Sequence, residues 1–128
     1  MGVPVHQVTD LIKQHRIQLF SSNYSLYADM SQRVMNTLAE FAPDMEIYSI
    51  DEAFLDLSNL YPCNQNPEAY ARQIKRTVQR YTGIPVCIGM GPTKTLAKLA
   101  NFAAKKWPHT QGVLDLSDHK RRHKLMTI

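Results

Sequence analysis

In Ile47-Tyr-Ser-Ile-Asp-Glu-Ala-Phe-Leu-Asp-Leu57, two strand-forming runs surround an adjacent pair of carboxylates. Neighbouring side chains on a regular strand point to opposite faces, so Asp51 and Glu52 can reach one cation only if a turn or a bulge lies there. A straight strand would instead bury Asp51 among aliphatic side chains, which is costly unless the carboxylate is paired. We therefore predict strands over residues 45–50 and 53–57, joined by a tight turn at the pair.

The acidic pair has two interpretations, and the spacing alone leaves both open. In the first, Asp51 and Glu52 bind Mg²⁺, which prefers oxygen ligands, keeps some waters and shares its coordination shell with substrate phosphates. In the second, Asp51 caps the turn and Glu52 forms a salt bridge with a nearby Lys or Arg. A two-ion site would need at least one further carboxylate, and Asp56 is a poor candidate because we expect it inside the second strand with a solvated or salt-bridged side chain.

Length and composition indicate one compact domain or a piece of one, with 128 residues and 44% apolar content. No apolar run approaches the roughly 18 residues that cross a bilayer, and the first residues do not follow the order of a signal peptide. We therefore expect a cytoplasmic protein that does not contact a membrane. The two cysteines, Cys63 and Cys87, support neither a disulfide framework nor a zinc site.

The charge is divided unevenly along the chain, although the formal net charge is only +4. Residues 1–71 hold three Lys/Arg and nine Asp/Glu, whereas residues 72–128 hold twelve and two. This asymmetry is typical of an acidic centre beside a basic surface that attracts polyanions such as nucleic acid. A solvated basic surface without a partner is the alternative.

Hydrophobic periodicity and capping signals predict helices that alternate with strands. The helices are expected over residues 5–15, 23–41, 66–83 and 92–106. Besides the two strands at the acidic pair, strands are expected over residues 17–20, 85–89 and 112–116. The basic tail that follows is expected to be a linker. This order indicates an α+β fold of the split βαβ type.

A glycine turn, Gly89-Met-Gly-Pro-Thr-Lys-Thr95, lies between a predicted strand and a predicted helix, where free backbone N–H groups favour an anion. It is not a P-loop, because Thr93 stands where that motif requires glycine. On the following helix, four polar side chains share one face that spans about 60° at 100° per residue. They are Lys94, Lys98, Asn101 and Lys105, and we call the three lysines the lysine face. A triphosphate would fit along this face; an ordinary exposed surface is the alternative.

Two further features of the basic half favour structural roles. Arg72, Arg76 and Arg80 recur at every fourth residue, which indicates a solvated helix face. Trp107 follows a predicted helix, so packing is favoured over stacking on a base.

Several ordered motifs together resemble the Y-family translesion DNA polymerases, most closely the branch of UmuC, the subunit of bacterial DNA polymerase V. The motifs are Phe20-Ser-Ser-Asn-Tyr-Ser-Leu-Tyr-Ala-Asp-Met30, Ser49-Ile-Asp-Glu-Ala-Phe-Leu-Asp-Leu57, Gly89-Met-Gly-Pro-Thr-Lys-Thr-Leu-Ala-Lys-Leu-Ala100 and Ala103-Ala-Lys-Lys-Trp107. The resemblance implies that residues 1–16 end the fingers, residues 17–116 form the palm, and residues 117–128 are a basic linker towards a thumb.

The resemblance also implies an architecture and a site. The palm would be ferredoxin-like, a split βαβ unit with a mostly antiparallel sheet and helices on one face, here lacking its first strand. Asp51 and Glu52 would be the catalytic ligands of Mg²⁺, and Ser49 would support their turn. Lys105 matches the lysine of the family that contacts the incoming triphosphate, and we expect Lys98 and Lys94 to extend that contact.

In function, the resemblance implies a parent enzyme that adds deoxynucleotides to a primer opposite damaged template, in SOS-type DNA repair. Its implied partners are primer-template DNA, deoxynucleoside triphosphates, a sliding clamp, a recombinase filament and a UmuD-like subunit. We expect this chain alone to be inactive, because the family's first strand and third metal ligand have no counterpart in it. That strand is central in such a sheet, so we also expect self-association or a rearranged sheet. The rival hypothesis is a non-enzymatic product that binds nucleic acid or partner proteins through its basic half.

Overall fold

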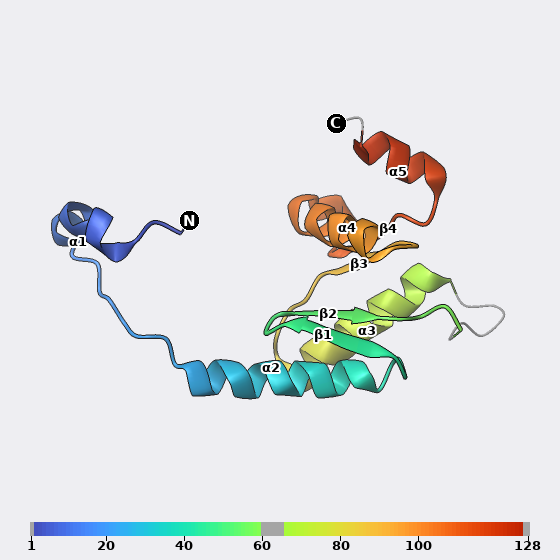
Figure 1. The fold of residues 1–128 in the computed structure, drawn as a ribbon, viewed down its shortest axis with the longest axis horizontal. Coiled ribbons are helices and arrows are strands. Elements are labelled where there is room, and N and C mark those ends of the chain that lie inside the picture. The colour runs from blue at the N-terminus through green and yellow to red at the C-terminus, as the bar shows by residue number, and fades with distance from the viewer. Residues whose placement is uncertain (1, 60–65, 127–128) are drawn as a thin grey trace.

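The structure is a computed structural model that describes residues 2–59 and 66–126 (Figure 1). Its helices are α1 (Thr9–His15), α2 (Tyr24–Ala39), α3 (Pro67–Thr82), α4 (Lys94–Lys106) and α5 (His119–Met126), with short 3₁₀ helices η1 (Val5–Gln7) and η2 (Pro108–Thr110). Its strands are β1 (Met45–Ser49), β2 (Glu52–Leu55), β3 (Ile88–Met90) and β4 (Val113–Asp115). The predicted mixture of helices and strands is confirmed.

The two longest helices begin where their capping residues predict. The Asn23 side chain accepts a hydrogen bond of 3.1 Å from the backbone N–H of Leu26 at the start of α2. Asn66 accepts one of 3.0 Å from the N–H of Glu68 at the start of α3. Gly83 then ends α3 in the left-handed conformation, with φ of 74°. These local signals fix the helix boundaries because each satisfies backbone groups that the helix leaves unpaired.

The strands β1 and β2 form an antiparallel hairpin, with Ser49 opposite Glu52 across the turn. The register shifts between Ile47 and Ser49, so the hairpin contains an irregularity as well as a tight turn. The predicted turn at the acidic pair is therefore confirmed. A bulge of this kind bends its strand and re-aims the side chains beside it.

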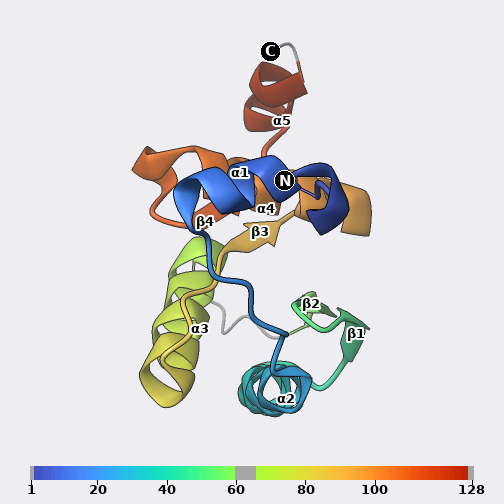
Figure 2. The same cartoon turned by 90° about the vertical axis from the view of Figure 1, so that its left-hand side faces the viewer.

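The strands β3 and β4 pair in parallel and hold the hydrophobic core. Met90 packs with Val113 and with Ala71 of α3, and all three are buried. Gly89 points the other way, towards α4: a Cβ atom there would lie 2.1 Å from the backbone nitrogen of Asn101. Because successive residues of a strand face opposite sides, α3 and α4 cover different faces of this pair. Figure 2 shows the two helices above and below β3.

This arrangement differs from the expected single, mostly antiparallel sheet with helices on one face. The described strands make two separate pairs, β1–β2 and β3–β4, and no described strand is hydrogen-bonded to both pairs. The predicted strand over residues 17–20 is wrong: this segment is an extended link between α1 and α2 (Figure 1). Its Phe20 side chain is 89% exposed. A strand needs the backbone groups of a neighbour, and the described residues supply none here.

The basic tail is helical, where a linker was predicted. Asp118 caps α5 by accepting a hydrogen bond of 2.9 Å from the N–H of Lys120. In the described part of the chain, no helix has both the length and the apolar character that crossing a membrane requires. Cys63 lies outside the described residues.

Candidate functional site

The acidic turn is held in place from two sides. The Ser49 hydroxyl donates a hydrogen bond of 2.8 Å to the carboxylate of Asp51. The Ser31 hydroxyl, on α2, donates one of 2.5 Å to the carbonyl oxygen of Ile50. Sequence reasoning missed Ser31, because 19 residues separate it from the turn and no local pattern marks it. Together the two serines fix where the Asp51 carboxylate points.

The Lys98 side chain of α4 meets the hairpin beside the acidic pair. Its ammonium lies 3.5 Å from the Glu52 carboxylate and 4.5 Å from the centre of the Tyr48 ring. Both partners are compatible with a cation, one through charge and the other through the π face. The structure therefore brings one predicted triphosphate ligand into contact with one predicted metal ligand.

Lys94, one helical turn earlier, meets the other end of the hairpin. Its ammonium forms an ion pair with Glu46 and lies 5.4 Å from the centre of the Phe54 ring. Glu46 and Phe54 are opposite each other in the register, so they share one face of the hairpin. Lys94 thus faces a carboxylate that the sequence interpretation had not assigned to any site.

Lys105 lies at the far end of α4, seven residues after Lys98 and therefore about 10 Å further along the helix axis. The residue is exposed. None of the ion pairs among the described residues includes it. The lysine face is therefore divided: two lysines contact the acidic hairpin, and the third points to solvent.

The fit of a divalent cation rests on Asp51 and Glu52 alone. Among the described residues, no group of three or more His, Cys, Asp or Glu side chains could hold a metal ion. Two carboxylates with open positions suit Mg²⁺ when water and substrate phosphates complete its shell. The contacts of the two residues also match the second interpretation, a turn capped by Asp51 and a salt bridge from Glu52 to Lys98. The cation site and the salt-bridged turn would use the same two carboxylates. An exposed ion pair such as Glu52–Lys98 contributes at most about 1 kcal/mol to stability.

Asp56 has a local role just after β2, outside the strand in which we expected it. The hydroxyl and the backbone N–H of Ser58 both donate hydrogen bonds to its carboxylate, the latter at 2.9 Å. These bonds favour the charged form and lower the pKa of Asp56 below its usual value.

The glycine turn before α4 serves packing. Gly89 lets α4 approach β3, and a Cβ atom at Gly91 would lie 2.8 Å from that of Leu96. The Thr93 hydroxyl accepts a hydrogen bond of 3.2 Å from the N–H of Leu96, so it uses one of the N–H groups that an anion would need. This explains why the segment has two glycines without being a P-loop.

A pocket of about 570 Å³ lies between this turn and the hairpin. Three carboxylates line it, those of Asp44, Glu46 and Asp56, against the single ammonium of Lys94. Its charge favours a cation over a phosphate group.

Comparison with known proteins finds relatives along the whole chain. Residues 1–101 match the family model described as the impB/mucB/samB family. The chain is 48% identical over 128 residues to Protein UmuC of Salmonella typhimurium (strain LT2) and 44% identical over 128 residues to Protein MucB of Escherichia coli. It is 36% identical over 95 residues to DNA polymerase IV of Moorella thermoacetica. These alignments cover 99%, 100% and 74% of this chain, but only 30%, 30% and 23% of the relatives. The chain therefore spans less than a third of the length of these curated relatives.

Proposed function

The chain belongs to the impB/mucB/samB family, and from that premise we propose that it is the palm segment of a UmuC-like, error-prone translesion DNA polymerase. The observation that carries the proposal is the acidic turn, with Asp51 and Glu52 beside Lys98, in a chain that is 48% identical to Protein UmuC. Carboxylates next to cationic side chains suit phosphoryl transfer, which relies on positioning and on charge stabilisation. The parent enzyme would extend a primer opposite damaged template, with DNA and deoxynucleoside triphosphates as substrates.

In this proposal Asp51 and Glu52 hold Mg²⁺, which supplies charge neutralisation for the phosphates when it is bound. Ser49 and Ser31 keep the carboxylate turn in one position. Lys98, whose ammonium lies 3.5 Å from the Glu52 carboxylate, would be the first candidate for a contact with a phosphate oxygen. Lys105, exposed further along α4, is the second candidate for a triphosphate contact, and Lys94 is the third, once it leaves Glu46.

The wider setting follows from the family. We propose a bacterial cytoplasmic enzyme whose partners include a sliding clamp, a recombinase filament and a UmuD-like subunit. Asp51 and Glu52 alone do not complete a two-ion site, so this chain by itself is proposed to be inactive in primer extension. Template-directed extension of a primer by the isolated chain would refute that part of the proposal.

A calorimetric titration with a deoxynucleoside triphosphate tests the site directly. We expect saturable binding in the presence of Mg²⁺ and none after chelation, because the triphosphate and the carboxylates share the cation. Asp51→Asn should abolish the Mg²⁺-dependent binding, since it removes one of the two charged ligands.

Asp56→Asn is the matched control, because it removes an equal charge a few residues away. It should bind the triphosphate as the unmodified chain does. Binding that does not depend on Mg²⁺, or equal losses in the two variants, would contradict the proposed site.

A further inference from the structure

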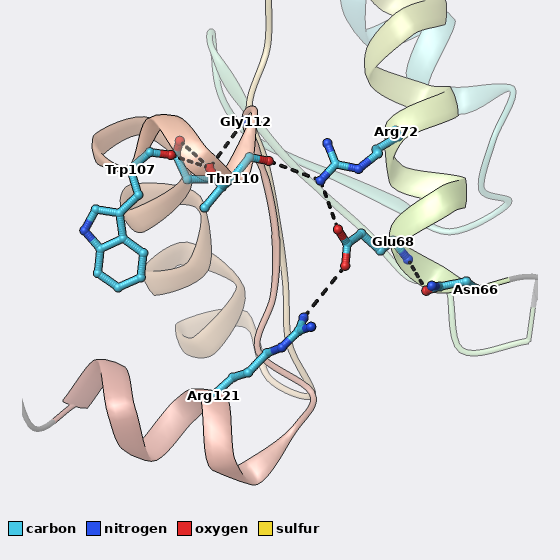
Figure 3. Close-up of polar contacts among 8 residues, drawn as sticks. Asn66, Glu68, Arg72, Trp107, Thr110, Gly112 and Arg121 are labelled. Carbon is cyan, nitrogen blue, oxygen red and sulfur yellow. Dashed lines mark hydrogen bonds and ion pairs between the residues drawn. The ribbon is translucent and has the colours of Figure 1, made fainter.

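A second pocket lies where α3, η2, β4 and α5 meet, and it shares no lining residue with the acidic hairpin (Figure 3). It encloses about 500 Å³ and is open on one side. Val113 and Leu116, both buried, form an apolar floor. This volume lies within the range of about 300–1,000 Å³ that is typical of sites for small ligands.

One wall of this pocket is a flat aromatic surface. The indole of Trp107 stacks on the imidazole of His109, with ring centres 5.7 Å apart and an angle of 20° between the planes. The buried Thr110 hydroxyl, within hydrogen-bond distance of the carbonyl oxygens of Ala104 (3.1 Å) and Trp107 (2.7 Å), fixes the backbone that carries the indole. The backbone that carries the aromatic wall is therefore held in place before any ligand arrives, which reduces the entropy lost on binding.

The rim of the pocket is cationic. Arg72, Arg121 and Lys124 line it together with one carboxylate, that of Glu68. Arg72 is firmly held, at 2.9 Å from Glu68 and 3.2 Å from the carbonyl oxygen of Thr110. Arg121 is 55% exposed and lies 3.7 Å from Glu68, so its guanidinium can turn to a ligand at little cost. Arg72 and Arg121 share the one carboxylate of Glu68, so this part of the rim carries a net positive charge beside the aromatic wall.

We propose that this pocket binds one nucleotide unit of a single-stranded nucleic acid, with its base against the Trp107 indole and its phosphate at the Arg121 guanidinium. A planar base matches the aromatic wall, because stacking on an indole accepts any base. A phosphate matches a guanidinium fork, which binds two of its oxygens at once. The helix α5 extends the cationic rim, since none of its residues is acidic, and this suits a polyanion better than an isolated ligand.

The protein contains a single tryptophan, so the fluorescence of Trp107 reports on this pocket alone. We expect a short oligothymidylate to quench it saturably at low salt. Thymidine monophosphate should quench it only at higher concentration, and inorganic phosphate should not quench it. Quenching by the mononucleotide at equal or lower concentration would assign the pocket to a free nucleotide and overturn the single-strand proposal.

Arg121→Ala should weaken the binding of the oligothymidylate about tenfold, the usual loss for one charge-assisted hydrogen-bonding group. Lys120→Ala is the matched control on the same helix, and we expect a change of less than about twofold. Arg121→Lys keeps the charge near Glu68 but removes the guanidinium fork, so we expect it to recover only part of the affinity that Arg121→Ala loses.

Two further results would overturn the proposal. The first is fluorescence that does not respond to any of the three probes. The second is an equal loss of affinity in Arg121→Ala and Lys120→Ala, because that would indicate diffuse attraction to the whole basic surface. Asp51→Asn should leave the quenching unchanged, so a failure here is distinguishable from a failure of the metal site.

Discussion

The hairpin β1–β2 and the pair β3–β4 are built from strands of similar length, yet they are supported very differently. In β3–β4, the Met90 and Val113 side chains are only 9% and 2% exposed. On the hairpin, Ile47 and Tyr48 are 55% and 57% exposed. The carboxylates of the proposed active site therefore lie on the lightly packed element, whereas the lysine face belongs to a helix that is anchored on the core.

Several polar contacts join the hairpin to the rest of the chain. They include the hydrogen bond from Ser31 to the turn and the ion pairs from Lys94 and Lys98. Exposed ion pairs contribute at most about 1 kcal/mol each, so these contacts can be exchanged for others. We therefore call the hairpin, whose ion pairs are exchangeable, the adjustable half, and the pair β3–β4 with α4 the fixed half. Substitutions in each half test this difference.

Gly89→Ala places a side chain at the contact between β3 and α4, in the fixed half, and should have the largest effect on stability. The new Cβ atom would lie 2.1 Å from the backbone nitrogen of Asn101 and 2.3 Å from the carbonyl oxygen of Ala97, and neither backbone atom can give way without moving α4. We expect the free energy of unfolding, measured by urea denaturation, to fall by about 3 kcal/mol.

Gly83→Ala is the control for this experiment. A Cβ atom at Gly83 meets nothing within 4 Å, so only the cost of its positive φ applies, about 1 kcal/mol. Equal effects of the two substitutions would mean that α4 is not anchored through Gly89.

Ser31→Ala tests the adjustable half, because the Ser31 hydroxyl supports the turn of the hairpin. It removes the hydrogen bond to the carbonyl oxygen of Ile50, and we expect a loss of about 1 kcal/mol. The loss should be local: hydrogen exchange at the amides of β1 and β2 should become faster, while exchange in β3 and β4 stays the same. Ser25→Ala, at an exposed position of α2, should change neither pair. Faster exchange throughout the chain would show that the two halves are not independent.

The smallest predicted effect concerns Asp56 and pH. Its hydrogen bonds from Ser58 lower the pKa in the folded chain, so their contribution to stability is present above the ordinary pKa of an aspartate and is lost as the pH falls through the lowered value. Ser58→Ala should raise the pKa of Asp56 towards its ordinary value, as measured by NMR titration of the carboxylate. An unchanged titration would mean that these hydrogen bonds do not form in solution.

Local signals in the sequence predicted much of this structure. Asn23 and Asn66 mark the starts of two helices, and the acidic pair marks the hairpin turn, because caps and turns depend on a few neighbouring residues. What could not be predicted depends on distant residues. The segment 17–20 has the composition of a strand but no described neighbour to pair with, and Ser31 supports the turn from another helix. The capping of α5 by Asp118 was a local signal that the sequence interpretation passed over.

We propose that Asp51 and Glu52, in the acidic turn beside Lys98, hold a divalent cation. Line broadening of backbone amide signals by Mn²⁺, a paramagnetic ion that prefers the same carboxylate ligands as Mg²⁺, tests it most directly. We expect low concentrations of Mn²⁺ to broaden the amides of Asp51, Glu52 and Ala53 first, to leave Val113 sharp, and to lose this selectivity in Asp51→Asn. Broadening that begins at Asp44 and Asp56, or that is the same in Asp51→Asn, would contradict the claim.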